Sequence, residues 1–551
     1  MHSLDYITVA LFALGVLGVG FSFMKSSTDM KGFFSAGGQV PWWISGLSLF
    51  MSFFSAGTFV VWGSIAYTHG WVSVTIQWTM AIAGFIIGFF IAPRWQEAKV
   101  LTAAEYIQRR LGLNVQKVYS YLFLAVSMFT TGGFLYPVAK IIQVSTGFPL
   151  GWSIVLLGLM VILYTSAGGL WAVIATDVLQ FVILTVAVLI IVPLALDKAG
   201  GLSGFTANAP DKFFEVFSGE YTLGFVLAFG LYNLFFIGGN WAYVQRYTSV
   251  ASKKDAKKVG YLFGSLYLIS PVIWMLPPML YRVLNPDLNG FGDEGAYLLM
   301  SKEVLPIGML GLMLGAMIFA TASSVNTSLN IVSGVFTNDI YKKLRPQASD
   351  AHLMRVARLA TAVFGVLTII VALLITDFGG IVEVILSVAA LTGGALYLPP
   401  LWSLFSKVQT GRSILSVSVI CLAINVFFKF IAPSVIGFSL DRTEEMMLGV
   451  MSPLLLLCCY EVYFRVFAPK QGQEVSSITE PEEINESLET SSGNAENEHG
   501  LKVISWGIAL VGIVVLLISF VAENGQAVVI AAGLAVAMIG IAMIFKIKSN
   551  K

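Results

Sequence analysis

The chain has 551 residues, of which 57% are hydrophobic and only 11% are charged, and its formal net charge is +1 at pH 7. Soluble globular domains carry about 25% charged residues, so this composition excludes a soluble enzyme and a disordered scaffold. A net charge close to zero also offers no basic field for nucleic acid. The three cysteines and four histidines lack disulfide-type or metal-type spacing, so we expect neither a disulfide framework nor a metal cluster.

Apolar stretches of 18 or more residues recur along the sequence, and each is long enough to cross a bilayer as a helix. These stretches are apolar all round rather than alternating, which favours helices over membrane strands. We predict about fifteen spans, at residues 4–24, 41–66, 73–97, 116–146, 149–167, 170–196, 222–247, 257–283, 303–337, 352–376, 380–406, 411–433, 446–467, 502–521 and 525–546. The chain is therefore predicted to be an all-α polytopic membrane protein.

Lysine and arginine lie mainly in alternate loops. Basic clusters occupy residues 25–31, 94–110, 246–258, 342–358, 407–412 and 546–551, whereas the opposite loops hold scattered cations such as Lys198, Lys212 and Arg442. Because cytoplasmic loops carry an excess of Lys and Arg, the N-terminus is predicted outside and the C-terminus in the cytoplasm. We expect a multi-pass protein of the cell (inner) membrane.

Residues 471–500 differ in composition from the rest of the chain. They contain eight glutamates and many serines and asparagines, but neither lysine nor arginine. Such a segment buries too little apolar surface to offset its ordering entropy, which predicts a disordered acidic cytoplasmic linker. A regulatory docking site is the alternative function for it.

Two predicted spans carry glycine and small residues near mid-membrane. The second contains Phe-Phe-Ser-Ala-Gly at residues 53–57, and the seventh contains Phe-Phe-Ile-Gly-Gly at residues 235–239. Glycine is favoured where a helix unwinds, and unwound backbone at membrane depth is tolerated where it lines a cavity. Two such helices five spans apart indicate an inverted repeat with a binding site near the midplane. Close helix packing through glycine is the alternative.

Polar groups inside the predicted spans are candidates for ion handling. Asp177 lies just inside the sixth span, and a carboxylate there either handles a cation or is held neutral or paired. The ninth span contains six polar residues within eight positions, namely Ser323, Ser324, Asn326, Thr327, Ser328 and Asn330. Hydroxyl and carbonyl oxygens suit a hard cation such as sodium, and hydrogen bonding between helices is the alternative role.

Three further polar side chains lie at membrane depth in other spans. Lys140 in the fourth span favours an anionic solute if it faces a cavity, and otherwise reaches an interface or pairs with backbone. Gln77 in the third span and Asn233 in the seventh are hydrogen-bonding groups at a depth that suits either solute contact or helix packing.

The sequence resembles the solute:sodium symporter family, whose members include sodium-coupled sugar, sialic acid and proline transporters. The matching stretches are Tyr-Thr-Ser-Ala-Gly-Gly-Leu-Trp-Ala-Val-Ile-Ala-Thr-Asp-Val-Leu-Gln at residues 164–180 and Ala-Thr-Ala-Ser-Ser-Val-Asn-Thr-Ser-Leu-Asn at residues 320–330. The pattern continues into Phe-Thr-Asn-Asp-Ile-Tyr at 336–341 and covers roughly residues 1–470. The resemblance implies a LeuT-type five-plus-five inverted-repeat core, with one extra N-terminal helix and four extra C-terminal helices.

The resemblance also implies sodium sites. The site shared in the family falls on the Ala320 carbonyl and the Ser323 and Ser324 hydroxyls, with opposing carbonyls from Met51 and Phe54. A second sodium site found in some members falls on Asp177, Ser323, Asn326 and Thr327. An asparagine at position 326 departs from the usual hydroxyl, so one or two sodium ions remain open.

The substrate-binding positions implied by the family only partly keep the sugar-transporter pattern. Gln77 and Asn233 match, whereas Phe236 replaces a tyrosine gate and Tyr267 replaces a lysine. Thr130 stands where a sialic acid transporter has its carboxylate-binding arginine. The hydroxyl-bearing residues Ser52, Ser55, Thr58 and Thr130 are candidates for replacement contacts.

These observations predict sodium-coupled symport of a small polar organic solute, a sugar or a sugar-derived acid, into the cell by alternating access. An amino acid or other carboxylate is the alternative solute, and a solute sensor or a proton-coupled carrier using Asp177 is the alternative of another class. No enzymatic activity and no cofactor besides Na⁺ as coupling ion are expected. The expected partners are Na⁺, the solute and the lipid bilayer, with no nucleic acid, and the chain as a monomer or weak oligomer.

The predicted organisation follows the spans. An N-terminal span with the first cytoplasmic loop takes residues 1–40, the first repeat residues 41–196 and the second repeat residues 197–410. Two additional spans take residues 411–470, the acidic linker residues 471–500, and two C-terminal spans residues 501–551.

Overall fold

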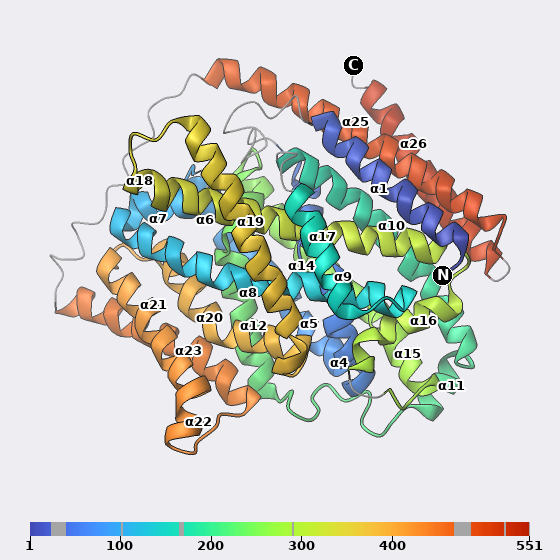
Figure 1. Cartoon of the computed structure of the whole chain (residues 1–551), viewed down its shortest axis with the longest axis horizontal. Helices are drawn as coiled ribbons and strands as arrows, with labels where there is room; N and C mark the ends of the chain where they lie inside the picture. Colours follow the sequence, from blue (N-terminus) through green and yellow to red (C-terminus); the bar gives the residue numbers. More distant parts are fainter. Residues whose placement is uncertain are drawn as a thin grey trace.

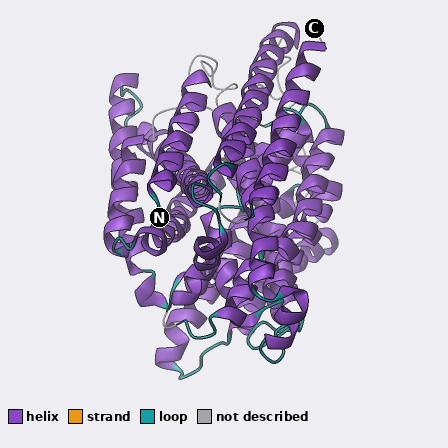
Figure 2. Cartoon of the chain, turned by 90° about the vertical axis from the view of Figure 1, so that its right-hand side faces the viewer, coloured by secondary structure: helices purple, strands orange, loops and turns teal. Residues whose placement is uncertain are grey.

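The computed structural model describes residues 1–23, 40–100, 103–164, 170–288, 291–467, 486–522 and 525–549. Within these ranges the regular secondary structure is helical, and strand-like pairing is limited to an isolated bridge between Ser218 and Tyr221 (Figure 2). The prediction of an all-α chain is confirmed for the described residues.

The first half of the chain consists of an outer helix and the first group of core helices. Their bounds are α1 (Ser3–Phe23), α3 (Trp42–Met51), η2 (Thr58–Trp62), α4 (Gly63–His69), α5 (Val72–Ile86), η3 (Ile87–Ile91), α6 (Ala92–Glu97), α7 (Ala103–Leu111), α8 (Leu113–Thr146), α9 (Leu150–Tyr164), α10 (Leu170–Lys198) and α11 (Gly201–Asn208). Figure 1 shows α1 on one flank of the molecule, where it packs against α10 and α17 (Met309–Val335).

The second group of core helices follows after α11. Besides α17 it comprises α12 (Leu223–Gly239), α13 (Trp241–Thr248), α14 (Lys253–Trp274), α15 (Leu276–Leu284), η4 (Gly292–Gly295), α16 (Ala296–Val304), η5 (Phe336–Tyr341), α18 (Lys342–Leu344), α19 (Asp350–Leu374), η6 (Thr376–Phe378) and α20 (Ile381–Ser403). The C-terminal helices are α21 (Gly411–Val426), η7 (Phe427–Ile431), α22 (Ala432–Val435), α23 (Arg442–Val466), α25 (Glu486–Ser519) and α26 (Gln526–Ser549).

Ten of the described helices are long and apolar enough to cross a membrane, and the bent pair α12–α13 raises this to eleven if it forms one span. Four shorter apolar helices, Ser3–Val16, Trp42–Met51, Leu150–Ile162 and Met309–Ala322, lie within the remaining predicted spans. The structure therefore supports a multi-pass membrane protein. The total of fifteen spans stays a prediction.

Both glycine-containing spans are interrupted where the sequence analysis placed the interruptions. Helix α3 ends at Met51, and regular helix resumes only near Thr58. Helices α12 and α13 meet at an angle of 60° around Asn240, whose side-chain oxygen accepts a hydrogen bond from the Ala242 N–H at 3.0 Å. A Cβ on Gly239 would lie 2.8 Å from the Tyr397 carbonyl oxygen, so this approach of two backbones requires glycine.

Part of the segment predicted to be a disordered linker is helical. Residues 471–485 lie outside the described residues, but 486–500 form the first turns of α25, and this part of the prediction is wrong. Glutamates near a helix N-terminus interact favourably with its dipole. An ion pair between Glu498 and Lys502, 2.7 Å apart, adds support one turn before the apolar part of the helix. The acidic composition therefore extends a helix here instead of preventing one.

Candidate functional site

Two adjoining cavities meet at the broken helices. One, the Asp177 cavity, has a volume of about 110 Å³ and lies among α8, α10, α13 and α17. The other, the Asn233 cavity, has a volume of about 150 Å³ and lies among the α3–η2 break, α8, α12 and α20. Both are lined by Ser52, Thr130, Phe134, Phe236, Tyr243 and Tyr397. These shared residues separate the two spaces.

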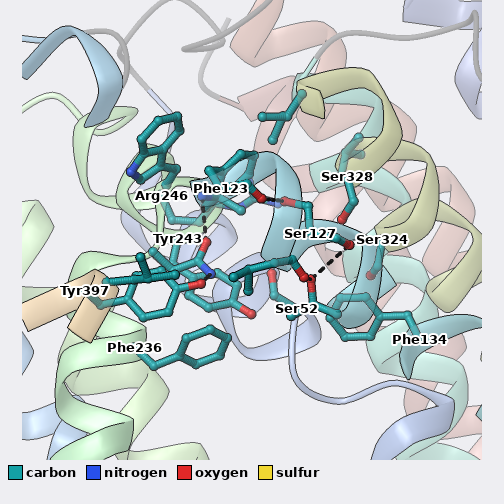
Figure 3. Close-up of a pocket in the computed structure, with 18 of the residues that line it drawn as sticks. Ser52, Phe123, Ser127, Phe134, Phe236, Tyr243, Arg246, Ser324, Ser328 and Tyr397 are labelled. Atoms are coloured by element: carbon teal, nitrogen blue, oxygen red, sulfur yellow. Dashed lines mark hydrogen bonds between the residues drawn. The ribbon is translucent and has the colours of Figure 1, made fainter. Parts of the chain in front are cut away.

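Aromatic rings form most of this separating layer. The Phe236 ring centroid lies 5.1 Å from that of Tyr397 and 5.4 Å from that of Tyr243. The Asn240 side-chain amide donates a hydrogen bond of 3.3 Å to the Tyr397 hydroxyl, which ties the α12–α13 break to α20. Figure 3 shows Phe236, Tyr243 and Tyr397 on one side of the cavity and Ser324 and Ser328 on the other, with Ser52 between them. The phenylalanine at 236 thus lies beside two tyrosines that supply the hydroxyls it lacks.

The Asn233 cavity gathers six of the eight predicted substrate residues. They are Ser52, Ser55, Thr58, Thr130, Asn233 and Phe236. The other two lie elsewhere: Gln77 is buried and donates to the Ser73 carbonyl at 3.2 Å, and Tyr267 is buried against Phe50 with ring centroids 5.0 Å apart. Gln77 and Tyr267 line neither of the two cavities as described.

Two of the gathered side chains are held in place by neighbours. The Thr58 hydroxyl donates to the Phe53 carbonyl at 2.6 Å and bridges the non-helical residues after α3. The Asn233 amide nitrogen donates to the Thr79 hydroxyl at 2.9 Å. Within the described residues the Asn233 amide oxygen accepts no hydrogen bond, so it is available to a donor in the cavity.

The break after α3 leaves backbone oxygens without donors. In the described part of the chain neither the Met51 nor the Phe54 carbonyl accepts a hydrogen bond. Across the break, the Ala56 N–H donates to the Thr321 hydroxyl at 3.3 Å, which places the break directly against α17 beside Ala320. Buried carbonyls are normally paired, so two free ones at this depth need another partner.

The polar run of α17 faces the same region. Ser324 lines the Asp177 cavity, and its hydroxyl donates to the Ala320 carbonyl at 3.2 Å. The side chains of Ser323, Asn326 and Thr327 lie outside what the structure describes, so their part in either predicted sodium site stays a prediction.

Asp177 is buried and engaged by two partners. Ser48 donates to its Oδ2 at 2.6 Å, and the Arg246 Nη2 lies 3.9 Å from the same oxygen. Arg246 Nε also donates to the Ser48 hydroxyl at 3.2 Å, so the three side chains form a closed cluster. Asp177 and Arg246 both line the cavity, so this cluster forms part of its wall.

Lys140 does not line either of these two cavities in the described structure. Its Nζ lies 3.5 Å from Glu294 Oε2, and the two side chains are 11% and 2% exposed. Tyr136 donates to the same carboxylate oxygen at 2.8 Å, and the Ile381 N–H donates to Oε1 at 3.1 Å. Burial raises the pKa of the Glu294 carboxyl, while the Lys140 charge and these hydrogen bonds act against the rise. The structure therefore pairs Lys140 with a buried carboxylate, a partner that the sequence did not indicate, and not with the predicted backbone carbonyl.

Sequence reasoning missed several residues that shape the site. Ser48, Asn240, Tyr243 and Tyr397 belong to this set, and Arg246 was predicted only as the first residue of the basic cluster 246–258. Asn240 carried a usable signal, because Asn directly after Gly-Gly and before a new helical stretch is a typical N-cap. The fully buried Gln180, one turn after Asp177, has a side-chain amide without a hydrogen-bond partner among the described residues.

Comparison with known proteins gives one family and several relatives within it. The family model described as the Sodium:solute symporter family matches residues 33–420. The sodium/glucose cotransporter of Vibrio parahaemolyticus is 28% identical over 471 residues, which cover 78% of this chain and 86% of that protein. The sodium/sialic acid symporter SiaT of Proteus mirabilis (strain HI4320) is 28% identical over 449 residues, covering 77% of this chain and 90% of that protein.

A solved structure shares the fold over most of the chain. It is a substrate-bound, outward-open Na⁺-coupled sialic acid symporter, which superposes with a TM-score of 0.69 at 24% identity and covers 85% of this chain and 98% of its own. This likeness confirms the expected fold class, that of the LeuT-type transporters, for the core helices around the two breaks.

Proposed function

The chain belongs to the sodium:solute symporter family and is a transporter rather than an enzyme, and on this basis we propose that it carries a small polar organic solute, a sugar or a sugar-derived acid, into the cell together with sodium. The proposal is supported by relatives named for sodium-coupled transport of glucose and sialic acid. The membrane potential and the sodium gradient drive the cycle, because one charge crossing 100 mV releases about 2.3 kcal/mol.

The observation that carries the proposal is the pair of free carbonyls at the break after α3. Met51 O and Phe54 O lack donors in the described residues, and the break is hydrogen-bonded to α17 next to Ala320. We propose that one sodium ion is bound there by these two carbonyls, by the Ala320 carbonyl and by the Ser323 and Ser324 hydroxyls. Oxygen ligands from two helices would hold the break ordered while the ion is bound.

A second sodium ion at Asp177 would have to share the Asp177 carboxylate with the guanidinium of Arg246. Arg246 and Ser48 occupy one carboxylate oxygen, and a sodium ion reaching Asp177 from α17 would weaken the Arg246 contact. We propose that such an ion binds only transiently, with Ser323, Asn326 and Thr327, while the first site sets the sodium dependence of uptake.

The Asn233 cavity is proposed to hold the solute. None of its described lining residues is charged, and its polar groups are hydroxyls and one amide among apolar and aromatic side chains. This lining suits a neutral solute with several hydroxyls, and few polar groups in an apolar pocket are enough to fix its orientation. A sugar or polyol is therefore favoured over a sugar acid, because Lys140 is paired with Glu294 and Arg246 lies on the Asp177 side of the aromatic layer.

The proposed cycle follows from the two cavities. Solute and sodium bind from outside, the aromatic layer of Phe236, Tyr243 and Tyr397 then opens, and both are released toward the Asp177 side, which the predicted topology places nearer the cytoplasm. The same topology puts the N-terminus outside and the C-terminus inside. We propose that the chain works as a monomer or weak oligomer.

Uptake into proteoliposomes tests the function. With an inward sodium gradient we expect accumulation of one class of neutral sugar or polyol, and replacement of sodium by choline at constant pH should abolish it. Ser324→Ala should raise the sodium concentration for half-maximal uptake about tenfold, equivalent to about 1.4 kcal/mol. Ser328→Ala, one turn further along the same cavity wall, is the control and should leave it unchanged.

A proton-coupled carrier is the second candidate, favoured by the burial of Asp177 in a cavity wall. Accumulation that persists in choline and follows a pH gradient would support it and overturn sodium coupling. Solute binding without accumulation under either gradient would instead indicate a sensor.

A further inference from the structure

The outer helix α1 makes an unusual contact with the beginning of α17. Asp5, which is 1% exposed, accepts hydrogen bonds through Oδ1 from the Gly308 N–H at 2.7 Å and the Gly311 N–H at 3.2 Å. Its Oδ2 accepts from the His2 N–H at 2.8 Å. Thr8 completes the contact by donating to the Gly308 carbonyl at 2.9 Å. A side chain near the N-terminus of the chain thus binds backbone some 300 positions later.

The N–H groups of Gly308 and Gly311 are donors that commonly bond to side chains of the helix's own first turn. Gly308 is the N-cap of α17 and Gly311 is its third residue, and in a capping box the side chains at these two positions bond each other's N–H groups. Glycine has no side chain, so α17 can make neither bond. Asp5 takes over both, and its negative charge lies at the positive end of the helix dipole.

From Gly311 onward, α17 packs closely against α1. A Cβ on Gly311 would lie 2.0 Å from the Asp5 carbonyl oxygen, so the two helices touch backbone to backbone. Further along, a Cβ on Gly315 would lie 3.1 Å from the Phe12 ring, and Phe12 packs edge-on against Phe319 at 5.9 Å between centroids. The described contact thus reaches Phe319, the residue before Ala320.

We propose that Asp5 is a positioning residue for sodium binding, because it supplies from α1 the cap that α17 lacks and so fixes the height and rotation of α17 at Ala320 and Ser324. This inference rests on the proposed sodium site. An ion site works only when its ligands are held within about 0.5 Å of the binding geometry. The extra helix outside the repeat core thereby acquires a role in coupling.

The test compares two substitutions of Asp5 in proteoliposomes. Asp5→Ala removes all three acceptor contacts and should raise the sodium concentration for half-maximal uptake about tenfold, while the maximal rate at saturating sodium stays within about twofold. Asp5→Asn keeps one acceptor oxygen for α17 but turns an amide group toward the His2 N–H. It should therefore raise the sodium concentration for half-maximal uptake less, about threefold. Leu14→Ala, on the exposed face of the same helix, is the matched control and should behave as wild type.

The outcomes separate this inference from the proposed site. If Ser324→Ala shifts the sodium dependence and Asp5→Ala leaves it at the wild-type value, Asp5 is only a structural cap and the inference is wrong. If Asp5→Ala shifts it but Ser324→Ala does not, the ion is bound elsewhere, and positioning of Ala320 and Ser324 is refuted together with the site. Should Asp5→Ala fail to fold, sodium-dependent thermal stabilisation of Asp5→Asn gives the same comparison: a midpoint at higher sodium supports the inference and an unchanged midpoint overturns it.

Discussion

Replacing Lys140 with methionine separates a structural role from solute recognition. Methionine keeps most of the unbranched side chain but removes the charge 3.5 Å from the Glu294 carboxylate, which is 2% exposed. Removal of one partner from a buried ion pair costs about 3–5 kcal/mol, since the other charge stays buried. Glu294 retains the Tyr136 hydroxyl and the Ile381 N–H, so we expect the lower end, about 3 kcal/mol.

The loss of stability should depend on pH in a defined direction. Burial already raises the pKa of Glu294 above 4.5, and loss of the Lys140 charge, which lowers this pKa, should raise it further. A carboxyl whose pKa is higher in the folded than in the unfolded state stabilises the fold fully at pH values below its unfolded-state pKa. This stabilisation is lost as the pH rises through its folded-state pKa. The loss of stability of Lys140→Met relative to wild type should therefore be smallest near pH 5 and grow toward pH 8.

Thermal unfolding of the purified protein in detergent measures this effect. We expect Lys140→Met to unfold a few degrees below wild type at pH 8, and the double variant with Glu294→Gln to recover part of the difference because no buried charge remains. Lys302→Met is the control: this exposed lysine donates to the Val144 carbonyl in the same corner, and its loss should have little effect. Unchanged stability of Lys140→Met together with selective loss of sugar-acid uptake would refute the argument and return Lys140 to solute binding.

Two further predictions concern the layer between the cavities. Asn240→Ala should lower the free energy of unfolding by about 1 kcal/mol, because it removes the N-cap of α13. It also releases the Tyr397 hydroxyl and should therefore increase sodium-independent solute efflux from preloaded proteoliposomes. Efflux equal to wild type would contradict a barrier role for Asn240. Gly393→Ala places a Cβ 2.1 Å from the ring of Tyr232, which lines the Asn233 cavity and must then shift, so the solute concentration for half-maximal uptake should rise about tenfold with sodium dependence unchanged. Gly334→Ala, with open space around its Cβ, is the control.

Local sequence patterns predicted the broken helices because the physical cause is local. Gly-Gly at residues 238–239 followed by Asn240 contains both the glycine that permits a close backbone approach and the residue that caps the next helix. The run from Ser323 to Asn330 likewise marked α17 as polar at membrane depth. Such signals come from a few adjacent residues and need no knowledge of the partner helix.

Partners across the fold could not be predicted in the same way. Lys140 and Glu294 are 154 positions apart, and Glu294 lies in a Gly-Asp-Glu-Gly turn that resembles any polar loop. Gln77 and Tyr267 belong to helices that are apolar on nearly all sides, so periodicity gives no indication of which face meets the cavity. The sequence therefore predicted which segments are apolar helices, whereas the rotation of each helix about its axis could not be predicted.

The two breaks contact each other through one side chain, which connects the proposed ion site to the barrier. Phe53 lies between the carbonyls of Met51 and Phe54, and its ring packs against Tyr243 at 4.6 Å and Phe236 at 6.1 Å between centroids. An ion that orders residues 51–54 must therefore also fix the ring that packs against the barrier.

Solute bound at the proposed site in the Asn233 cavity would contact this arrangement from its other side, because Phe53 and Phe236 line that cavity as well. Each ligand then stabilises the packing that the other requires, and linkage demands that sodium strengthen solute binding by the same factor by which solute strengthens sodium binding. Coupling in this transporter thus needs no contact between ion and solute. It needs only that the break after α3 and the break before α13 are joined by the packing of the Phe53 ring.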